Sequence, residues 1–503
     1  LIKGKGNSDE MKQENLVVVT VNQAGFEYDI HSLVKAFYPA CDVKVYAGEE
    51  EKESSGAGFP DIDIRFTEEA VLLSLVGDEG STASFGAKKV DIAKDLSRPE
   101  VKNRLKQLIY TALSEYTHKK LPWGTLTGIR PTKIPMTMLE EGNSEKQIME
   151  HMKETYFISE EKGELAIQIA KREKALLDTL HYEDGYSLYI GIPFCPTTCL
   201  YCSFTSYPIF SWKKRIGEYL DALEKEIEFV AEVYQDKVLD TIYIGGGTPT
   251  TLEAPELYRL LTKLRSSLDL SHLKEFTVEA GRADSITLEK LKVLKECGVT
   301  RISVNPQTMK QETLDLIGRK HTVEQVKEAF AMAREAGFTN INMDLILGLP
   351  GEKEEDVHHT IEEVIKLAPD SLTVHSLAIK RASKLNQWIE ENGISALNNT
   401  DETMKLAAEG ARELHMVPYY LYRQKNMSGN FENVGYAREG KFGIYNILIM
   451  EEKQTILALG AGSITKRVFP DGRIERCDNV KDVKLYIEQI DEMIERKRRL
   501  LED

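Results

Sequence analysis

Apolar and polar residues alternate in a regular order between about residue 184 and residue 380. Short apolar runs rich in β-branched residues are typical of buried strands, and each lies beside a stretch whose apolar residues recur at helical spacing. Strands that alternate with helices predict an α/β fold with a parallel sheet. Six such units fit an open, partial (β/α)6 barrel better than a closed barrel of eight. The strand-like runs cover residues 186–192 and begin again near Thr241, Glu275, Arg301, Ile341 and Ser371.

The chain before this barrel predicts two further regions. Residues 1–95 read as a small α+β domain, and residues 96–183 read as a helical connector. The predicted strands of the first region are 16–21, 43–46, 61–66 and 70–75, with a helix around 30–37. The connector has helical spacing over 99–118 and predicted helices near 132–140, 145–154 and 159–180.

The predicted barrel is assigned to residues 184–380, and residues 381–503 form a C-terminal region with helices expected near 382–392 and 401–415. A chain of 503 residues is long enough for these several regions and for a large core.

Composition and charge exclude several classes of protein. A hydrophobic content of 42% is that of an ordinary globular protein, so disordered and fibrous classes are excluded. A formal net charge of −16 argues against nucleic acid as the main partner, because phosphate binding requires a basic surface. We expect no membrane span, since no apolar run approaches about 20 residues. Six cysteines and no secretory signal pattern predict a cytoplasmic location.

Three of these cysteines lie directly after the first predicted barrel strand. Cys195, Cys199 and Cys202 have C-x3-C-x2-C spacing. Thiolates this close in sequence can wrap one [4Fe–4S] cubane, with each sulfur on a separate iron. No nearby cysteine or histidine supplies a fourth ligand, so one iron is left open for a small molecule. An open metal position is a place for chemistry, whereas a fully ligated cluster mostly carries electrons.

Two other uses of these cysteines were weighed. A disulfide would leave one thiol over, and the sequence shows no sign of export. A structural zinc site usually has four ligands, commonly in two C-x2-C or C-x2-H pairs, and only one half is present. The cluster is therefore the better hypothesis.

Glycines follow the second predicted barrel strand, where ligands bind in folds of this kind. Residues 245–250 read Gly-Gly-Gly-Thr-Pro-Thr. Consecutive glycines let the backbone approach a ligand closely, and their carbonyls can accept hydrogen bonds from an ammonium group. A nucleoside triphosphate loop is disfavoured, because no G-K-[ST] follows. A plain tight turn is the alternative.

Polar side chains also follow the next predicted strands. Glu279 ends the third strand, where its carboxylate can hold a ribose diol or serve a structural ion pair. Gln307 follows the fourth strand, and Arg319 offers a guanidinium for a ligand carboxylate. Asp344 lies in or at the end of a strongly apolar run, so its charge requires a partner.

Together these motifs resemble the radical S-adenosylmethionine (SAM) superfamily. More narrowly, they resemble the oxygen-independent coproporphyrinogen III dehydrogenase family, in particular its longer HemZ-type branch. The resemblance covers about residues 186–467. The motifs that carry it are Tyr-Ile-Gly-Ile-Pro-Phe-Cys, Gly-Gly-Gly-Thr-Pro-Thr, Gly-Arg-Lys-His, Asp-Leu-Ile-Leu-Gly-Leu-Pro-Gly and Leu-Gly-Ala-Gly-Ser.

This resemblance implies a radical SAM barrel that binds a [4Fe–4S] cluster and SAM. The open iron would be chelated by the amino and carboxylate groups of SAM, and no catalytic side chain is assigned beyond the cluster and the SAM radical. The implied metal ligands are Cys195, Cys199 and Cys202. The implied cofactor-binding residues are Tyr189, Gly246, Gly247, Thr248, Glu279, Gln307, Arg319 and Asp344.

The resemblance also implies a tetrapyrrole partner, either coproporphyrinogen III or haem, and a low-potential electron donor. The first hypothesis is a coproporphyrinogen III dehydrogenase of haem and porphyrin biosynthesis, an oxidoreductase that converts two propionates to vinyl groups and gives protoporphyrinogen IX. The second is a haem chaperone of the same fold, and the third is another radical SAM enzyme that modifies tetrapyrroles.

Two positions depart from the dehydrogenase pattern. Position 204 is Phe, as in the haem-chaperone relatives, where proven dehydrogenases usually have a further Cys. Position 191 is Gly, where the family commonly has His. The C-terminal region includes a segment at 419–426 that mixes aromatic residues with Arg423 and Lys425, a combination suited to a macrocycle with carboxylates. A half-buried edge strand is the alternative there. Residues 442–463 resemble the family's cover over the barrel mouth.

Overall fold

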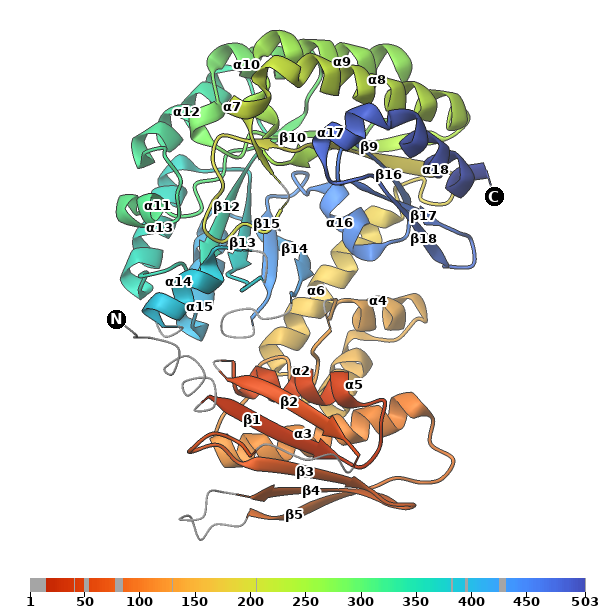
Figure 1. The fold of residues 1–503 in the computed structure, drawn as a ribbon, viewed down its shortest axis with the longest axis vertical. Coiled ribbons are helices and arrows are strands. Elements are labelled where there is room, and N and C mark those ends of the chain that lie inside the picture. Colours follow the sequence, from red (N-terminus) through yellow and green to blue (C-terminus); the bar gives the residue numbers. More distant parts are fainter. Residues whose placement is uncertain are drawn as a thin grey trace, which may run out of the picture. The chain divides into compact units, whose positions relative to one another are not determined.

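The structure, a computed structural model shown in Figure 1, describes residues 15–39, 41–48, 54–76, 85–128, 130–204, 206–380, 383–393, 397–424 and 431–502. The chain divides into two compact units. One contains the described residues up to Ile167, and the other contains most of those from Gln168 onward. In the described part of the chain, no helix combines the length and the apolar character that a membrane span requires.

The N-terminal unit is built on a five-stranded sheet in the order β2-β1-β3-β4-β5. Helices α2 and α3 lie on one face of it (Figure 1), where apolar residues of both helices and of the strands form one core. Helix α3 begins at a capping box, in which the Glu100 carboxylate accepts from the amide and hydroxyl of Ser97. The elements are β1 (Leu16–Val21), α2 (Glu27–Phe37), β2 (Asp42–Ala47), β3 (Asp61–Phe66), β4 (Ala70–Val76), β5 (Phe85–Asp91), α3 (Arg98–Thr117), α4 (Lys133–Glu140) and α5 (Glu145–Tyr156). Helix α6 (Glu160–Leu177) leads to the second unit.

The second unit contains the predicted open barrel. Six parallel strands lie side by side in chain order, and helices cover the outer face of their sheet (Figure 1). The strands are buried on both faces, which explains their continuous apolar runs. They are β6 (Gly185–Ile192), β9 (Val238–Gly246), β10 (Glu275–Glu279), β11 (Arg301–Ser303), β12 (Ile341–Leu347) and β13 (Ser371–Ser376). The helices are α8 (Ile216–Val233), α9 (Ala254–Ser267), α10 (Leu288–Glu296), α11 (Gln311–Leu316), α12 (Val323–Glu335), α13 (Glu354–Leu367), α14 (Leu385–Asn392) and α15 (Asp401–Glu413).

The C-terminal region extends this sheet at both edges to eleven strands. On one side β15 (Asn433–Ala437) pairs antiparallel with β13, and β14 (Val417–Tyr422) is the edge strand. The segment at 419–426 is therefore an edge strand up to Tyr422, but Tyr419 to Leu421 and Arg423 are buried, so the alternative of a half-buried strand with solvated charges is only partly correct. On the other side β16 (Thr455–Leu459) pairs with β6 and is followed by the antiparallel strands β17 (Ile464–Val468) and β18 (Ile474–Asp478). Helices α16 (Ile444–Glu451), α17 (Val483–Glu488) and α18 (Ile490–Glu502) complete the region.

The pairing of β16 with β6 is parallel, and a buried polar network secures it. The Tyr219 hydroxyl donates to the Gly191 carbonyl at 2.6 Å and accepts from the Ala461 amide at 3.2 Å. The Glu226 carboxylate accepts from the Gly460 amide at 2.8 Å and lies 2.6 Å from Lys497 Nζ on α18. Both charged side chains are fully buried, so each ion requires the other.

The division of the chain at residues 95, 183 and 380 stays a prediction. The helices of the predicted connector up to α5 belong to the same compact unit as the N-terminal sheet.

Candidate functional site

One cavity of about 500 Å³ lies at the carboxyl ends of the barrel strands and is lined by all eleven residues predicted for the cluster and for SAM. These residues come from β6, β9, β10 and β12 and from the segments that follow β6, β9 and β11, so the fold brings together positions that are up to 155 residues apart. The roles predicted for the eleven residues stay predictions. They are Tyr189, Cys195, Cys199, Cys202, Gly246, Gly247, Thr248, Glu279, Gln307, Arg319 and Asp344.

The cysteine loop follows β6 and begins with the two-residue strand β7 (Phe194–Cys195). Thr248 Oγ1 donates to Cys195 Sγ at 3.6 Å, and the Cys202 amide donates to the Cys199 carbonyl at 3.1 Å. Burial raises the pKa of the Cys195 and Cys202 thiols, because apolar surroundings disfavour a thiolate. Bound iron would supply the positive charge that reverses this effect.

Across the described residues, no group of three His, Cys, Asp or Glu side chains is arranged to hold a metal ion. A single ion requires donors that converge on one point, as in a zinc site. A cubane differs, because each cysteine binds a different iron and the sulfurs need not converge.

The glycine loop after β9 is fastened to the cysteine loop. The Gly247 amide donates to the Ile192 carbonyl at 2.8 Å, and the Thr248 amide donates to the Phe194 carbonyl at 2.7 Å. A Cβ on Gly247 would lie 2.5 Å from the Phe194 carbonyl oxygen and 3.0 Å from Cys195 Sγ. Gly246 has φ +107°, a conformation that side chains disfavour. Both glycines are thus required by the close approach of the two loops.

Glu279 lies beside a stack of three tyrosines. The rings of Tyr243 and Tyr445 are stacked at 4.5 Å, and Tyr189 lies 6.3 Å from the Tyr243 ring. The Tyr243 hydroxyl donates to Glu279 Oε1. Burial raises the pKa of Glu279 to about 7, and the nearby charge of Asp344 acts in the same direction. Tyr243 was missed by the sequence reasoning, because inside a strand an aromatic residue looks like part of the core.

Buried polar atoms at the end of β11 and just after it lack partners among the described residues. Ser303 Oγ, Asn305 Oδ1 and Gln307 Oε1 are buried without a hydrogen-bond partner among the described residues, and all three residues line the cavity. Gln307 has φ +67°, which is unusual for a residue with a side chain. The Arg319 guanidinium donates to the Asn305 carbonyl and so secures the same segment. Buried polar atoms normally have partners, so these atoms suit a polar ligand.

Asp344 lies in the middle of β12 and has the partner that its burial requires. Asn342 Nδ2 donates to Asp344 Oδ1 at 2.7 Å, and His375 Nε2 on β13 lies 3.9 Å from Asp344 Oδ2. Burial opposes ionisation of Asp344, but the hydrogen bonds and the charge of His375 lower its pKa overall. The Tyr422 hydroxyl of β14 lies 3.3 Å from His375 Nδ1. His375 was not predicted, since a single histidine in a strand gives no sequence signal.

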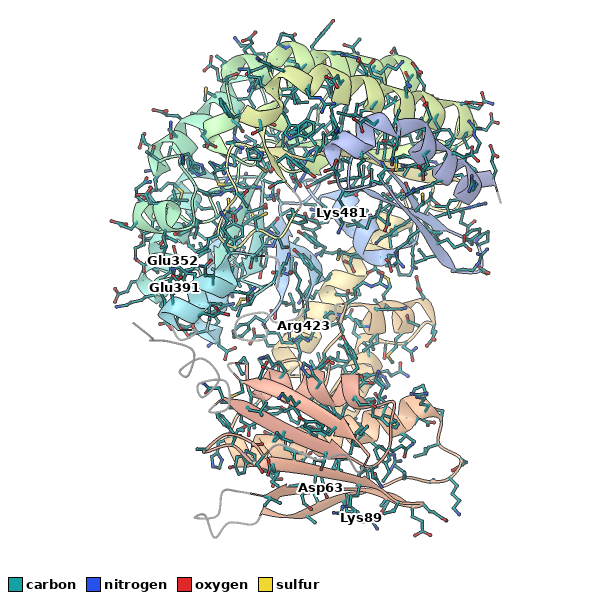
Figure 2. The ribbon with its side chains drawn as sticks, viewed as in Figure 1. Asp63, Lys89, Glu352, Glu391, Arg423 and Lys481 are labelled. Atoms are coloured by element: carbon teal, nitrogen blue, oxygen red, sulfur yellow. The ribbon has the colours of Figure 1, made fainter. Side chains whose placement is uncertain are left out.

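The aromatic and cationic segment around β14 is only partly in the cavity. Tyr420, Tyr422 and Gln424 line it. Arg423, labelled in Figure 2, is buried but is not among the lining residues, and burial lowers its pKa to about 10. Lys425 lies outside the described residues. The cation that does line the cavity on this side is Lys380, whose Nζ lies 5.3 Å from the centre of the exposed Phe204 ring.

The family model described as the Radical SAM superfamily matches residues 189–364. With the partial barrel and the cysteine loop at its mouth, this match defines a radical SAM protein. The chain is also 39% identical over 485 residues to the oxygen-independent coproporphyrinogen-III oxidase-like protein HemZ of Bacillus subtilis (strain 168). This alignment covers 94% of this chain and 95% of that protein. The chain therefore belongs to the HemZ family of oxygen-independent coproporphyrinogen III oxidase-like proteins.

Two further similarities cover the barrel. The chain is 35% identical over 309 residues to the heme chaperone HemW of Bacillus subtilis (strain 168). This alignment covers 61% of this chain and 76% of that protein. The solved structure of coproporphyrinogen III oxidase (HemN) from Escherichia coli, a radical SAM enzyme by its description, matches with a TM-score of 0.50. That match has 24% sequence identity and covers 64% of this chain and 72% of the other, so it shows the fold.

Membership of this superfamily implies a [4Fe–4S] cluster and SAM, and the cavity fits both groups. Three cysteine sulfurs offer soft ligands for iron at one wall. Glycines keep side chains away from the adjoining wall. The unpartnered oxygens of Ser303, Asn305 and Gln307 lie at the next wall, where a nucleoside or amino-acid group can supply hydrogen bonds.

Proposed function

We propose that the protein is a radical SAM coproporphyrinogen III dehydrogenase, which oxidatively decarboxylates two propionate groups to vinyl groups and yields protoporphyrinogen IX. One observation carries the proposal: the cavity that holds the eleven predicted residues also has a wall of tyrosines with His375 and Lys380. When bound and reduced, the cluster with SAM supplies a 5′-deoxyadenosyl radical, which can abstract hydrogen from an unactivated carbon. Protein side chains alone cannot perform this chemistry.

In this proposal the chain's own residues orient SAM. Cys195, Cys199 and Cys202 hold the cluster, and the loop at Gly246, Gly247 and Thr248 receives the methionine amino group. Ionised Glu279 accepts from the ribose diol, which requires its proton to leave. Gln307, Arg319 and Asp344 complete the contacts to the nucleoside and the carboxylate. The fixed orientation and the enclosed cavity protect a reactive species from water.

The opposite wall of the cavity suits a flat macrocycle with carboxylates. Tyr420 and Tyr422 offer apolar ring faces, and Lys380 offers a cation for a propionate. The two ring nitrogens of His375 face Asp344 and the Tyr422 hydroxyl, so His375 holds these two side chains in place at this wall. An external low-potential donor must reduce the cluster, and this donor is a further proposed partner.

A haem chaperone of the same fold is the second candidate. Position 204 favours it, because Phe204 exposes 68% of its surface, lines the cavity and has Lys380 Nζ 5.3 Å from the centre of its ring. An exposed aromatic ring beside a cation would contact the face and the propionate of haem. The 35% identity to HemW also supports this candidate.

The test uses the full chain, reconstituted with iron and sulfide without air and given SAM, dithionite and coproporphyrinogen III. Mass analysis should show two successive losses of carbon dioxide plus two hydrogens, with one 5′-deoxyadenosine formed for each loss. Stoichiometric haem binding with no such turnover would overturn the proposal in favour of the chaperone.

A paired variant tests the substrate wall. Lys380→Met should raise the KM for coproporphyrinogen about tenfold, the effect of about 1.4 kcal/mol of lost binding, while SAM affinity stays unchanged. Lys237→Met, which removes a surface lysine paired with Asp184, is the control and should leave both quantities unchanged. A KM that does not respond to Lys380→Met would remove Lys380 from the substrate site.

A further inference from the structure

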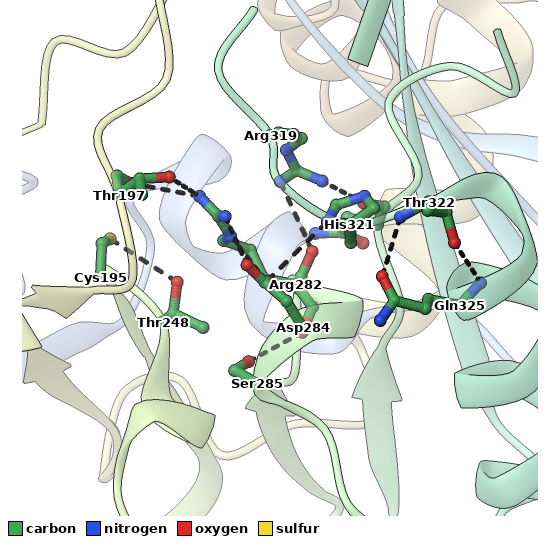
Figure 3. Close-up of polar contacts among 12 residues, drawn as sticks. Cys195, Thr197, Thr248, Arg282, Asp284, Ser285, Arg319, His321, Thr322 and Gln325 are labelled. Carbon is green, nitrogen blue, oxygen red and sulfur yellow. Dashed lines mark hydrogen bonds and ion pairs between the residues drawn. The ribbon is translucent and has the colours of Figure 1, made fainter. Parts of the chain in front are cut away.

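A buried arginine after β10 holds the cysteine loop from outside the set of cysteine ligands. Arg282 Nη1 donates to the Thr197 carbonyl at 3.1 Å and to Thr197 Oγ1 at 2.8 Å, and it lies 3.9 Å from Cys199 Sγ. Figure 3 shows this contact between the loop and the turn that follows β10. The Arg282 side chain is 4% exposed. Its charge is therefore placed at the loop with little screening by water.

Asp284 fixes the direction in which this arginine points. Arg282 Nε donates to Asp284 Oδ1 at 3.0 Å, and Nη2 donates to Asp284 Oδ2 at 2.7 Å. This two-point contact occupies one edge of the planar guanidinium and leaves Nη1 for the loop. A lysine has one nitrogen and cannot make both contacts in the same geometry.

The charges around Arg282 can be assigned. Burial opposes ionisation of Asp284, but the proximity of His321 and the hydrogen bonds from Arg282 hold its pKa well below the usual range, so it is a carboxylate. His321 is fully buried 3.8 Å from Asp284 Oδ1, and burial lowers its pKa. His321 is therefore neutral near pH 7, and the cations beside the Cys199 sulfur are Arg282 and Arg319.

The loop has a second attachment that does not involve Arg282. Thr197 Oγ1 donates to the Gly318 carbonyl at 3.0 Å, and the Leu200 amide donates to the Ile317 carbonyl at 2.9 Å. Both acceptors lie directly before Arg319. Variants at Arg282 should consequently keep part of the loop structure and still load a cluster.

We propose that Arg282 is a positioning residue that orders the cysteine loop and raises the reduction potential of the cluster bound there. An added electron makes the cluster more negative, so a fixed cation beside one of its sulfurs stabilises the reduced form. Net charge and hydrogen bonds to sulfur are among the factors that set the potential of such clusters. The proposal rests on the cluster implied by the family and is independent of the substrate.

The experiment measures the midpoint potential of the reconstituted full-length protein by a redox titration followed by electron paramagnetic resonance. Arg282→Gln removes the cation and should shift the potential to a more negative value. Asp284→Asn removes the neighbouring negative charge and should shift it to a more positive value. Arg282→Lys keeps the charge and should lie between the parent and Arg282→Gln. If Arg282 only supported the loop, Arg282→Gln and Asp284→Asn would not shift the midpoint potential in opposite directions.

Iron content and the melting temperature of the protein before iron loading are measured alongside. Arg334→Gln is the matched control, because Arg334 also pairs with a carboxylate, Asp370, and donates to the carbonyls of Phe338 and Ala368. It should lower the melting temperature and leave the potential unchanged. An unchanged potential in loaded Arg282→Gln, or shifts of the same sign in Arg282→Gln and Asp284→Asn, would overturn the proposal. These readouts are independent of coproporphyrinogen turnover, whose failure would bear only on the proposed function.

Discussion

Two walls of the same cavity differ in how their polar groups are satisfied. The cysteine wall is bonded to the rest of the protein, since Thr248, Arg282 and the turn at Gly318 all contact it. The wall after β11 leaves Ser303 Oγ, Asn305 Oδ1 and Gln307 Oε1 without partners among the described residues. Contacts within the protein already hold the cysteine wall in place. The wall of Ser303, Asn305 and Gln307 obtains its missing hydrogen bonds from the ligand that it binds. Changes at the first should therefore affect assembly and stability, and changes at the second should affect affinity.

The largest expected effect is at the cysteine wall itself. Cys199→Ala should abolish iron retention and 5′-deoxyadenosine release, because two thiolates cannot hold the cubane. Iron analysis and chromatography of the nucleoside products measure both. Cys297→Ala, which changes a buried cysteine outside the cavity, is the control and should retain both properties. Equal retention by the two variants would eliminate the cluster assignment.

A glycine of the cysteine wall should give the next largest effect. Gly247→Ala places a Cβ 2.5 Å from the Phe194 carbonyl, so the two loops must separate, and we expect loss of several kcal/mol in stability together with most iron binding. Gly217→Ala is the matched control, since its Cβ meets nothing within 4 Å and it lies in α8. That change should stabilise the protein by about 0.5–1 kcal/mol. Thermal unfolding separates the two, and a neutral Gly247→Ala would show that the loops are not in contact.

At the wall of Ser303, Asn305 and Gln307, a substitution should change the affinity for SAM more than the stability of the protein. Gln307→Leu removes an oxygen that has no partner among the described residues, so stability should change by less than about 1 kcal/mol while the Kd for SAM rises about tenfold. Thr250→Val breaks the 2.7 Å contact between two buried hydroxyls, Thr250 and Ser285. It should cost about 1–3 kcal/mol of stability and leave the Kd unchanged. If both variants lost stability equally, the two walls would not differ in the way described.

The smallest expected effect is a dependence on pH. Because burial raises the pKa of Glu279 to about 7, the folded protein keeps a proton there that the unfolded chain releases near pH 4.5. This contribution to stability is complete below about pH 4.5 and is lost as the pH rises toward 7. SAM affinity should increase over pH 6 to 8, as the carboxylate forms beside Tyr243 and Asp344. Isothermal titration with Glu279→Gln should show no such increase, whereas the same slope in that variant would assign the titration to another group.

The barrel could be predicted because its strands are buried on both faces and give continuous apolar runs. The runs that begin at Thr241, Glu275, Arg301, Ile341 and Ser371 lie in β9 to β13, and four of them begin at the observed first residue of the strand. The motif residues after these strands could be located for the same reason. Their convergence on one cavity follows from the parallel order of the strands.

The C-terminal strands could not be predicted in the same way. Strand β16 has five residues, and its pairing with β6 is set by tertiary contacts rather than by a local pattern. Arg282 also escaped detection, because an arginine just past a strand looks like a surface residue until the cysteine loop is placed over it. Pairing across 267 residues, as between Ser187 and Gln454, leaves no local signature.

The parallel pairing of β16 with β6, the strand that leads to the cysteines, has a consequence for the synthesis of the protein. During translation β6 is made early, β16 follows some 260 residues later, and α18 with Lys497 follows β16. Until then one edge of the cysteine-bearing strand is bare and Glu226 has no counter-ion. Iron delivered before β16 and α18 are made would meet an incomplete sheet, so we expect loading of the metal to follow the synthesis of these segments.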